Sequence, residues 1–155
     1  MKSNTQEPKE VELFVSLKIP DTTAVTAMQT MRKMGYNVSR VKRINYYKFY
    51  IGDNKEEFEN KIKKIDVLVN VNKHKASTKL ERDESAIYLL IKDIGDNCSN
   101  LTAVLRDRLN LKELKRMERG VIWALYIDSG NKEEIAKRIG KELLCNENYQ
   151  EIKVF

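Results

Sequence analysis

The sequence lacks most of the residues that dominate active sites and metal centres. Its 155 residues include a single His, His74, and two Cys, Cys98 and Cys145, which stand far apart with no CxxC pair. No GxSxG, Walker-type or GxGxxG sequence is present. A general base or a metal ligand needs partners, and nothing in the sequence places them beside His74. We therefore expect no catalytic residues, no cofactor and no metal site, and we expect both Cys to be reduced, partly buried thiols.

Long apolar runs are missing as well. No window approaches the roughly 18 apolar residues that a membrane span needs, and residues 1–10 are polar, without the apolar core of a signal peptide. Only 2 Pro and 6 Gly occur, and 41% of the residues are hydrophobic, which is typical of a folded chain without low-complexity segments. We expect a flexible N-terminus over residues 1–10, a cytoplasmic location and no membrane contact.

Positive charge is in excess and is unevenly distributed along the chain. The formal net charge is +6, and residues 1–80 hold 16 Lys and Arg against 9 Asp and Glu, whereas residues 81–155 hold 13 against 14. The basic surplus therefore belongs to the first half of the chain. Such a surplus suits RNA, a phosphorylated ligand or an acidic protein partner, and composition alone does not choose among them.

The two halves of the chain look like copies of one unit. Residues 41–70 recur at 114–146 after a shift of about 75 residues, which is too long for a solenoid repeat and indicates two fused small domains. The corresponding pairs are Lys42-Arg43 with Lys115-Arg116, Tyr50-Ile51 with Tyr126-Ile127, Asn54 to Glu57 with Asn131 to Glu134, and Asn70 with Asn146. We place repeat 1 at residues 11–75, a charged linker at 76–85 and repeat 2 at 86–155.

Each repeat is predicted to contain a strand, a helix, a hairpin, a second helix and a last strand. Alternating apolar residues at 11–19 indicate the first strand, and the apolar run at 86–91 indicates its counterpart. Residues 38–44 and 46–51 are predicted to form the first hairpin, turning near Asn45, and residues 111–117 and 121–127 the second, turning around Gly120. Asp21, Asn54 and Asn131 are the expected helix caps, Gly35 the end of the first helix and Asn70 a left-handed helix end.

The predicted fold class is therefore α+β, with two tandem βαββαβ ferredoxin-like units whose helices cover one face of each sheet. The other sheet face would carry Tyr, Trp and Phe, and an apolar face of that kind needs cover. We expect the two repeats to pack through their sheet faces as an internal pseudo-dimer.

The order and spacing of short motifs resemble the PurS family, the small subunit of phosphoribosylformylglycinamidine synthase. In the first half the resemblance covers Val15-Ser16-Leu17-Lys18, Asp21, Met34-Gly35-Tyr36, Val41-Lys42-Arg43 and Leu68-Val69-Asn70. In the second half it covers Ile91-Lys92, Lys115-Arg116, Gly120 and Leu143-Leu144-Cys145-Asn146. Together the two matches span residues 11–155, so the chain resembles two PurS-like units in tandem.

This resemblance implies a non-catalytic adaptor in purine biosynthesis. As a dimer, such a subunit bridges a glutaminase and an ATP-dependent synthetase so that ammonia passes between them, and a tandem chain would supply the dimer in one polypeptide. The expected partners are those two subunits, with further homo-oligomerisation left open. The residues expected to contact partners are Arg40, Lys42, Arg43, Tyr47, Lys115, Arg116 and Trp123.

Two other functions remain open from the sequence. Paired βαββαβ units of the ACT type bind amino acids at their interface, although those domains have a Gly-rich turn where this chain has Pro20-Asp21-Thr22. A four-stranded ferredoxin-like sheet can also stack RNA bases on its aromatic side chains. The basic-Gly-aromatic run of RNA-binding sheets is absent from both halves, so the sequence does not favour nucleic acid.

Overall fold

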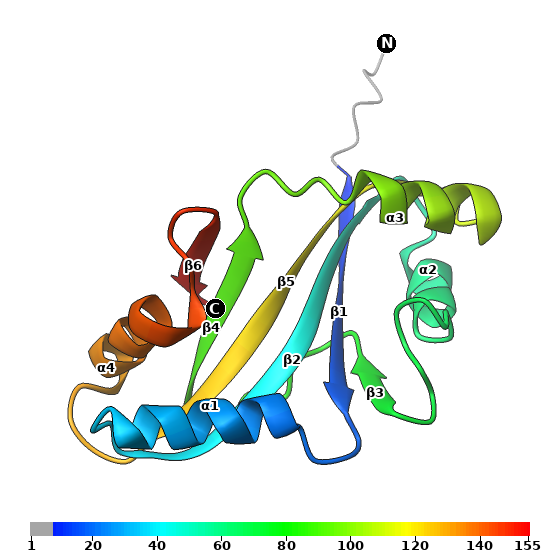
Figure 1. Ribbon diagram of the computed structural model, residues 1–155. Coiled ribbons are helices and arrows are strands. Elements are labelled where there is room, and N and C mark those ends of the chain that lie inside the picture. The colour runs from blue at the N-terminus through cyan, green and yellow to red at the C-terminus, as the bar shows by residue number, and fades with distance from the viewer. Residues whose placement is uncertain (1–7) are drawn as a thin grey trace.

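The described part of the protein, residues 8–155 of a computed structural model, forms an α+β fold with one six-stranded antiparallel sheet and four α-helices (Figure 1). Residues 1–7, part of the predicted flexible N-terminus, lie outside this description. Across residues 8–155, none of the helices combines the length and apolar character that crossing a membrane requires. The strand order is β3 (His74–Ser77), β1 (Lys9–Leu17), β2 (Val38–Ile51), β5 (Leu114–Ile127), β4 (Ala86–Asp93) and β6 (Gln150–Val154).

The two halves of the chain contribute equivalent parts to this sheet. Strands β3, β1 and β2 come from the first half and β5, β4 and β6 from the second, so the strand order reads the same from either edge. One sequence offset takes Val38 to Leu114 and Ile51 to Ile127, and it also takes Asn70 to Asn146. The side-chain oxygen of Asn70 accepts a hydrogen bond from the N–H two residues later at 3.0 Å, and that of Asn146 does the same at 3.1 Å. The sequence repeat is therefore also a repeat in local structure.

Neither predicted hairpin exists. Residues 38–51 form the single strand β2, residues 114–127 form the single strand β5, and these two strands pair with each other along nearly their whole length. A two-residue hairpin needs a positive φ at its turn, and neither Asn45 nor Gly120 has one. Each half therefore contributes three strands instead of the four of a ferredoxin-like unit, because each predicted hairpin is one continuous strand.

Gly120 has a structural role other than turning the chain. It lies opposite Tyr46 in the β2–β5 pairing, where the end of β4 approaches closely. A Cβ at this position would lie 2.7 Å from the carbonyl oxygen of Ile91 and 2.8 Å from Cγ of Lys92. Because Gly120 has no side chain, the end of β4 at Ile91 and Lys92 can approach β5 closely at the last residues of the β4–β5 pairing.

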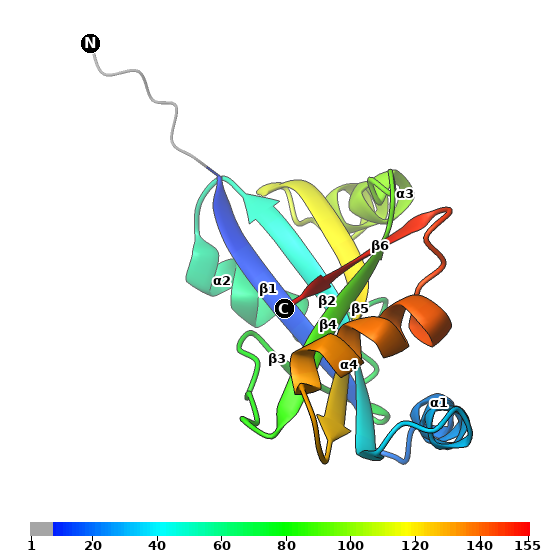
Figure 2. The same ribbon diagram turned by 90° about the vertical axis from the view of Figure 1, so that its left-hand side faces the viewer.

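All four helices cover the same face of the sheet, which we call the helix face, and they do so in mixed pairs (Figures 1 and 2). Helix α2 (Lys55–Ile62) and helix α3 (Ser99–Ala103), which continues as the π-helical turn η1 (Val104–Arg108), cover one end of the long strands. Helix α1 (Thr22–Lys33) and helix α4 (Lys132–Ile139), which continues as the π-helical turn η2 (Gly140–Leu144), cover the other end. Each of these two cores therefore buries one helix from each half.

The opposite face, which we call the open face, carries a third apolar cluster. Phe14, Tyr46, Tyr88 and Tyr126 are buried there beneath the linker side chain Leu80 and the C-terminal Phe155. The halves thus join edge to edge through β2 and β5, and the predicted packing of one sheet face against the other is wrong. Burial by the linker and the C-terminus covers the aromatic face without a second sheet.

Most of the residues predicted to cap or end helices do so in the structure. Asp21 caps α1 by accepting from the N–H groups of Thr23 and Ala24, and Asn131 caps α4 by accepting from that of Glu134. Gly35 follows α1 with φ 94°. The predicted side-chain cap at Asn54 is wrong, because this residue has φ 58° and its side chain makes no hydrogen bond to the helix α2.

Other ends differ from the prediction. Asn70 is not among the described residues with positive φ, so the predicted left-handed helix end is also wrong. Strand β1 already begins at Lys9, and β3 extends to Ser77.

Candidate functional site

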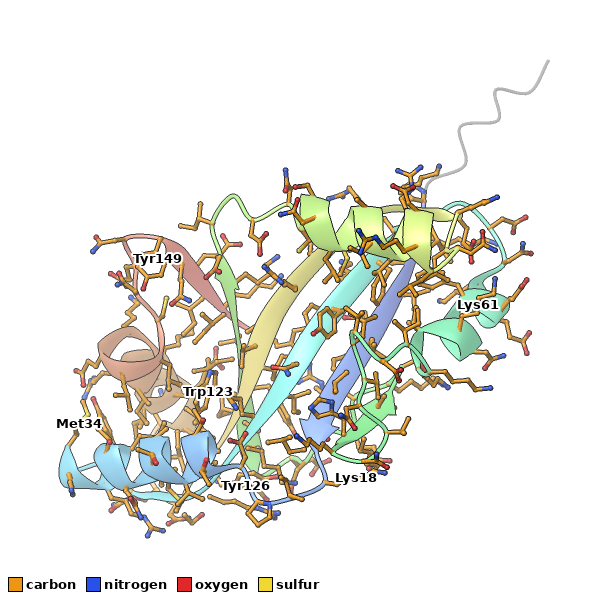
Figure 3. All side chains as sticks on the ribbon, turned by 45° about the vertical axis from the view of Figure 1, so that its right-hand side comes forward. Lys18, Met34, Lys61, Trp123, Tyr126 and Tyr149 are labelled. Atoms are coloured by element: carbon orange, nitrogen blue, oxygen red, sulfur yellow. The ribbon has the colours of Figure 1, made fainter. Side chains whose placement is uncertain are left out.

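The basic cluster of β2 divides between the two faces of the sheet, as strand alternation predicts. Arg40 and Lys42 are exposed on the open face, with their charged ends 5.7 and 5.8 Å from the centre of the Tyr126 ring. Arg43 points to the helix face, where its guanidinium lies 6.0 Å from the Trp123 ring. Trp123 and Tyr126 both come from the end of β5 nearest α1, far from Lys61 on α2 (Figure 3). Arg40 and Lys42 therefore point to the same face of the sheet, whereas Arg43 points to the other.

Arg43 forms one of two equivalent ion pairs. Its Nε donates to Asp21 at 3.1 Å, so the α1 cap and strand β2 are tied together. The Nε of Arg119 donates to Asp96 at 2.9 Å in the second half. The pKa of the Asp96 carboxyl lies below its usual range, first because the N–H of Cys98 bonds to it and then because of Arg119.

Arg119 is a site residue that the sequence comparison missed. The alignment matched Arg43 with Arg116, whereas the offset between β2 and β5 matches it with Arg119. Asp21 and Asp96, which precede the first helix of each half, are separated along the chain by nearly the same number of residues as Arg43 and Arg119. This shared spacing could have shown that Arg43 corresponds to Arg119.

A central groove lies on the helix face between the two mixed cores. Tyr47 and Trp123 occupy equivalent positions in the two halves, and each lies opposite an arginine in the β2–β5 pairing, Arg119 and Arg43 respectively. Burial raises the pKa of the Tyr47 phenol, which packs against Phe49 at a ring separation of 6.2 Å. The groove has a volume of about 370 Å³. Two aromatic rings and two guanidinium groups thus line a concave site near the middle of the long strands.

A larger basic groove opens where β1 and β2 separate. Figure 1 shows these two strands diverging toward their lower ends. The β1–β2 pairing ends at Val15 and Asn45, after which β1 continues beside β3 alone. The groove has a volume of about 720 Å³, within the range of ligand sites. All three residues of the basic cluster line it, together with Lys75, Lys79 and apolar side chains of α1.

Lys115 and Arg116 are placed away from this groove. Arg116 lies on the open face near the opposite end of β2, with its guanidinium 3.7 Å from the centre of the Tyr50 ring and 3.4 Å from Glu118. Lys115 is exposed where the β2–β5 register shifts. The seven predicted contact residues therefore form no single site: Arg40, Lys42 and Arg43 meet at the basic groove, Arg43, Tyr47 and Trp123 at the central groove, and Lys115 and Arg116 at the far end.

The aromatic residues of the open face are not available for stacking. Tyr46 is 3% exposed and Tyr126 is 9% exposed. Burial and the hydrogen bond that the Tyr46 hydroxyl donates to Glu12 at 2.6 Å raise the pKa of that phenol. Base stacking needs an exposed ring face, so this arrangement does not favour RNA on the open face.

His74, Cys98 and Cys145 have local structural roles. The Nδ1 atom of His74 accepts a hydrogen bond from the backbone N–H of Asn70 at 3.0 Å. Both Cys are free, and they are buried more completely than the partly buried thiols that the sequence predicted; burial raises the pKa of each thiol. Within residues 8–155, no three His, Cys, Asp or Glu side chains are grouped as metal ligands.

Comparisons with known proteins add no relative to this description. No protein-family model matches the chain, and no curated protein matches it.

Proposed function

We propose that this chain is a non-catalytic adaptor that bridges the glutaminase and the ATP-dependent synthetase of phosphoribosylformylglycinamidine synthase in purine biosynthesis. In this proposal the two halves are PurS-like units, and their joining through β2 and β5 is an internal pseudo-dimer. The adaptor holds the two enzymes together so that ammonia passes from one to the other.

The observation that carries the proposal is the two-fold repetition within one continuous sheet. A strand order that reads the same from both edges, together with equivalent Arg–Asp pairs, gives one chain two related surfaces. A bridging subunit needs two such surfaces at a fixed separation, and a shared sheet with two mixed cores provides a rigid connection between them. The basic groove adds a surface on the first half that suits an acidic partner.

Reconstitution with purified glutaminase and synthetase tests the adaptor function. We expect product formation from glutamine to require this chain, and product formation from added ammonium to proceed without it, because only the first needs ammonia transfer between subunits. Identifying the proteins that co-purify with the chain from its native extract is the complementary measurement. Equal glutamine-dependent rates with and without the chain would contradict the proposal.

The central groove favours ligand sensing as a second candidate function. It lies where the two halves meet, which is where paired ACT-type units bind amino acids, and it presents Arg43 and Arg119 beside Trp123 and Tyr47. An arginine can hold the carboxylate of an amino acid while an aromatic ring contacts its side chain. Thermal unfolding in the presence of each amino acid tests this function, since a specific ligand raises Tm with concentration. No shift with any of them would remove it.

A further inference from the structure

The first half of β2 presents an unpaired strand edge to the basic groove. Arg40–Ile44 pairs with β5 on one side, whereas β1 has already turned toward β3 on the other. The side chain of Arg32 bonds to the carbonyls of Val38 and Ser39, but no described residue other than those of β5 bonds to the backbone between Arg40 and Ile44. In an antiparallel strand, alternate residues direct N–H and C=O groups to the same edge. Such an edge is a template for another strand.

The two sides of this edge differ in chemistry. Toward α1 the wall of the groove is apolar at Ala24, Val25 and Met28. The ion pair of Arg43 with Asp21 also lies on this side. Toward the open face it is basic, because Arg40 and Lys42 point there. Lys75 on β3 and Lys79 in the linker add two more cations on that side, and Glu81 of the linker adds one carboxylate to the groove lining. None of these four cations forms an ion pair with a residue in the described range 8–155.

We propose that the basic groove binds a short extended segment of a partner protein, which adds as a strand beside Arg40–Ile44 and alternates acidic with apolar side chains. Successive side chains of a strand point to opposite faces, so the acidic set meets Arg40 and Lys42 while the apolar set meets α1. The β1–β2 pairing occupies β2 from Asn45 onward, so about five residues of the bound segment can pair with the free edge at Arg40–Ile44, and further residues extend beyond it. The assignment of this segment to a subunit bridged by the adaptor rests on the proposed function.

A synthetic peptide with the sequence Asp-Val-Asp-Val-Asp-Val, blocked at both ends, is the probe. We expect saturable binding to the purified full chain, measured by calorimetry, and slower hydrogen exchange at alternate amides between Arg40 and Ile44, measured by NMR. The block peptide Asp-Asp-Asp-Val-Val-Val has the same composition and charge but cannot place its side chains alternately. It is expected to bind at least about tenfold more weakly, a loss of roughly 1.4 kcal/mol.

Variants of the protein separate the charge contribution from the strand contribution. Arg40→Glu with Lys42→Glu is expected to weaken binding about tenfold or more, with a smaller loss for the neutral pair Arg40→Gln with Lys42→Gln. The matched control reverses two exposed lysines away from the groove, Lys55→Glu on α2 with Lys64→Glu just after that helix, and is expected to leave binding unchanged.

Peptides N-methylated at alternate residues test the backbone pairing. Methylation removes N–H donors from one edge only, so one of the two alternating patterns should abolish binding and the other should retain it. Equal binding of the alternating and block peptides, or equal effects of both methylation patterns, would overturn the proposal and indicate a general anion site. Concentration-dependent dimerisation that itself protects the amides between Arg40 and Ile44 would overturn it in favour of a second copy of the chain. All of these assays use the isolated chain, so they can succeed even if reconstitution with glutaminase and synthetase fails.

Discussion

Replacing Gly120 by Ala tests whether the close approach of β4 and β5 depends on a missing side chain. The new Cβ would lie 2.7 Å from the backbone oxygen of Ile91, a distance that side-chain rotation cannot relieve because the contacted atom belongs to the main chain. Overpacking of this kind typically costs about 1–3 kcal/mol. For a chain of this length, each kcal/mol lowers Tm by roughly 2–4 °C.

Urea and thermal unfolding of Gly120→Ala, compared with Gly52→Ala, provide the measurement. At Gly52 a Cβ would meet only Cε of Lys115 at 3.5 Å, an ordinary contact with the end of a flexible side chain. Gly52→Ala is therefore expected to be neutral or to stabilise by up to about 1 kcal/mol, because Ala reduces the entropy of the unfolded chain. If Gly120→Ala proved as stable as Gly52→Ala, the close packing of β4 on β5 would be refuted.

Three further predictions concern titratable and capping side chains. Asp21→Asn keeps an acceptor for the α1 cap but loses the charge that pairs with Arg43, whereas Asp21→Ala loses both, so urea unfolding should show Asp21→Ala less stable than Asp21→Asn by about 1 kcal/mol. The lowered pKa of Asp96 means that folding favours its ionised form, so its stabilisation is complete above the unfolded pKa of about 3.9 and is lost as pH falls through the lower folded value. Acid titration of unfolding should therefore show a shallower loss for Asp96→Asn than for the parent chain, and identical slopes would rule out this linkage. Cys98 and Cys145 are buried with raised pKa values, so a thiol reagent at pH 8 should modify both slowly in native protein and rapidly in urea, and fast native labelling would contradict their burial.

Local features could be predicted from the sequence wherever one residue and its neighbours along the chain determine the structure. The cap at Asp21, the helix stop at Gly35 and the division of Arg40 and Arg43 between two faces follow from short-range rules, and each is confirmed. The equivalence of Asn70 and Asn146 was also visible, and the structure repeats the same turn at both.

Long-range pairing could not be predicted from these rules. Asn45 and Gly120 are residue types that favour turns, but each lies inside a continuous strand that pairs with the long strand of the other half. Cross-strand pairing outweighs a local turn preference because nearly all residues of the two long strands gain a partner in the β2–β5 pairing. The basic groove was not predicted for the same reason, since it exists only where β1 leaves β2 to join β3.

The mixed cores have a consequence for synthesis on the ribosome. When the first half emerges, β2 exposes a long unpaired edge, and its two cores lack the helices that α3 and α4 later supply. At translation rates of about 5–20 residues per second, β5 follows β2 only after several seconds. During that interval the nascent chain exposes a strand edge that can pair with other chains, and basic side chains such as those on β2 disfavour pairing of this kind.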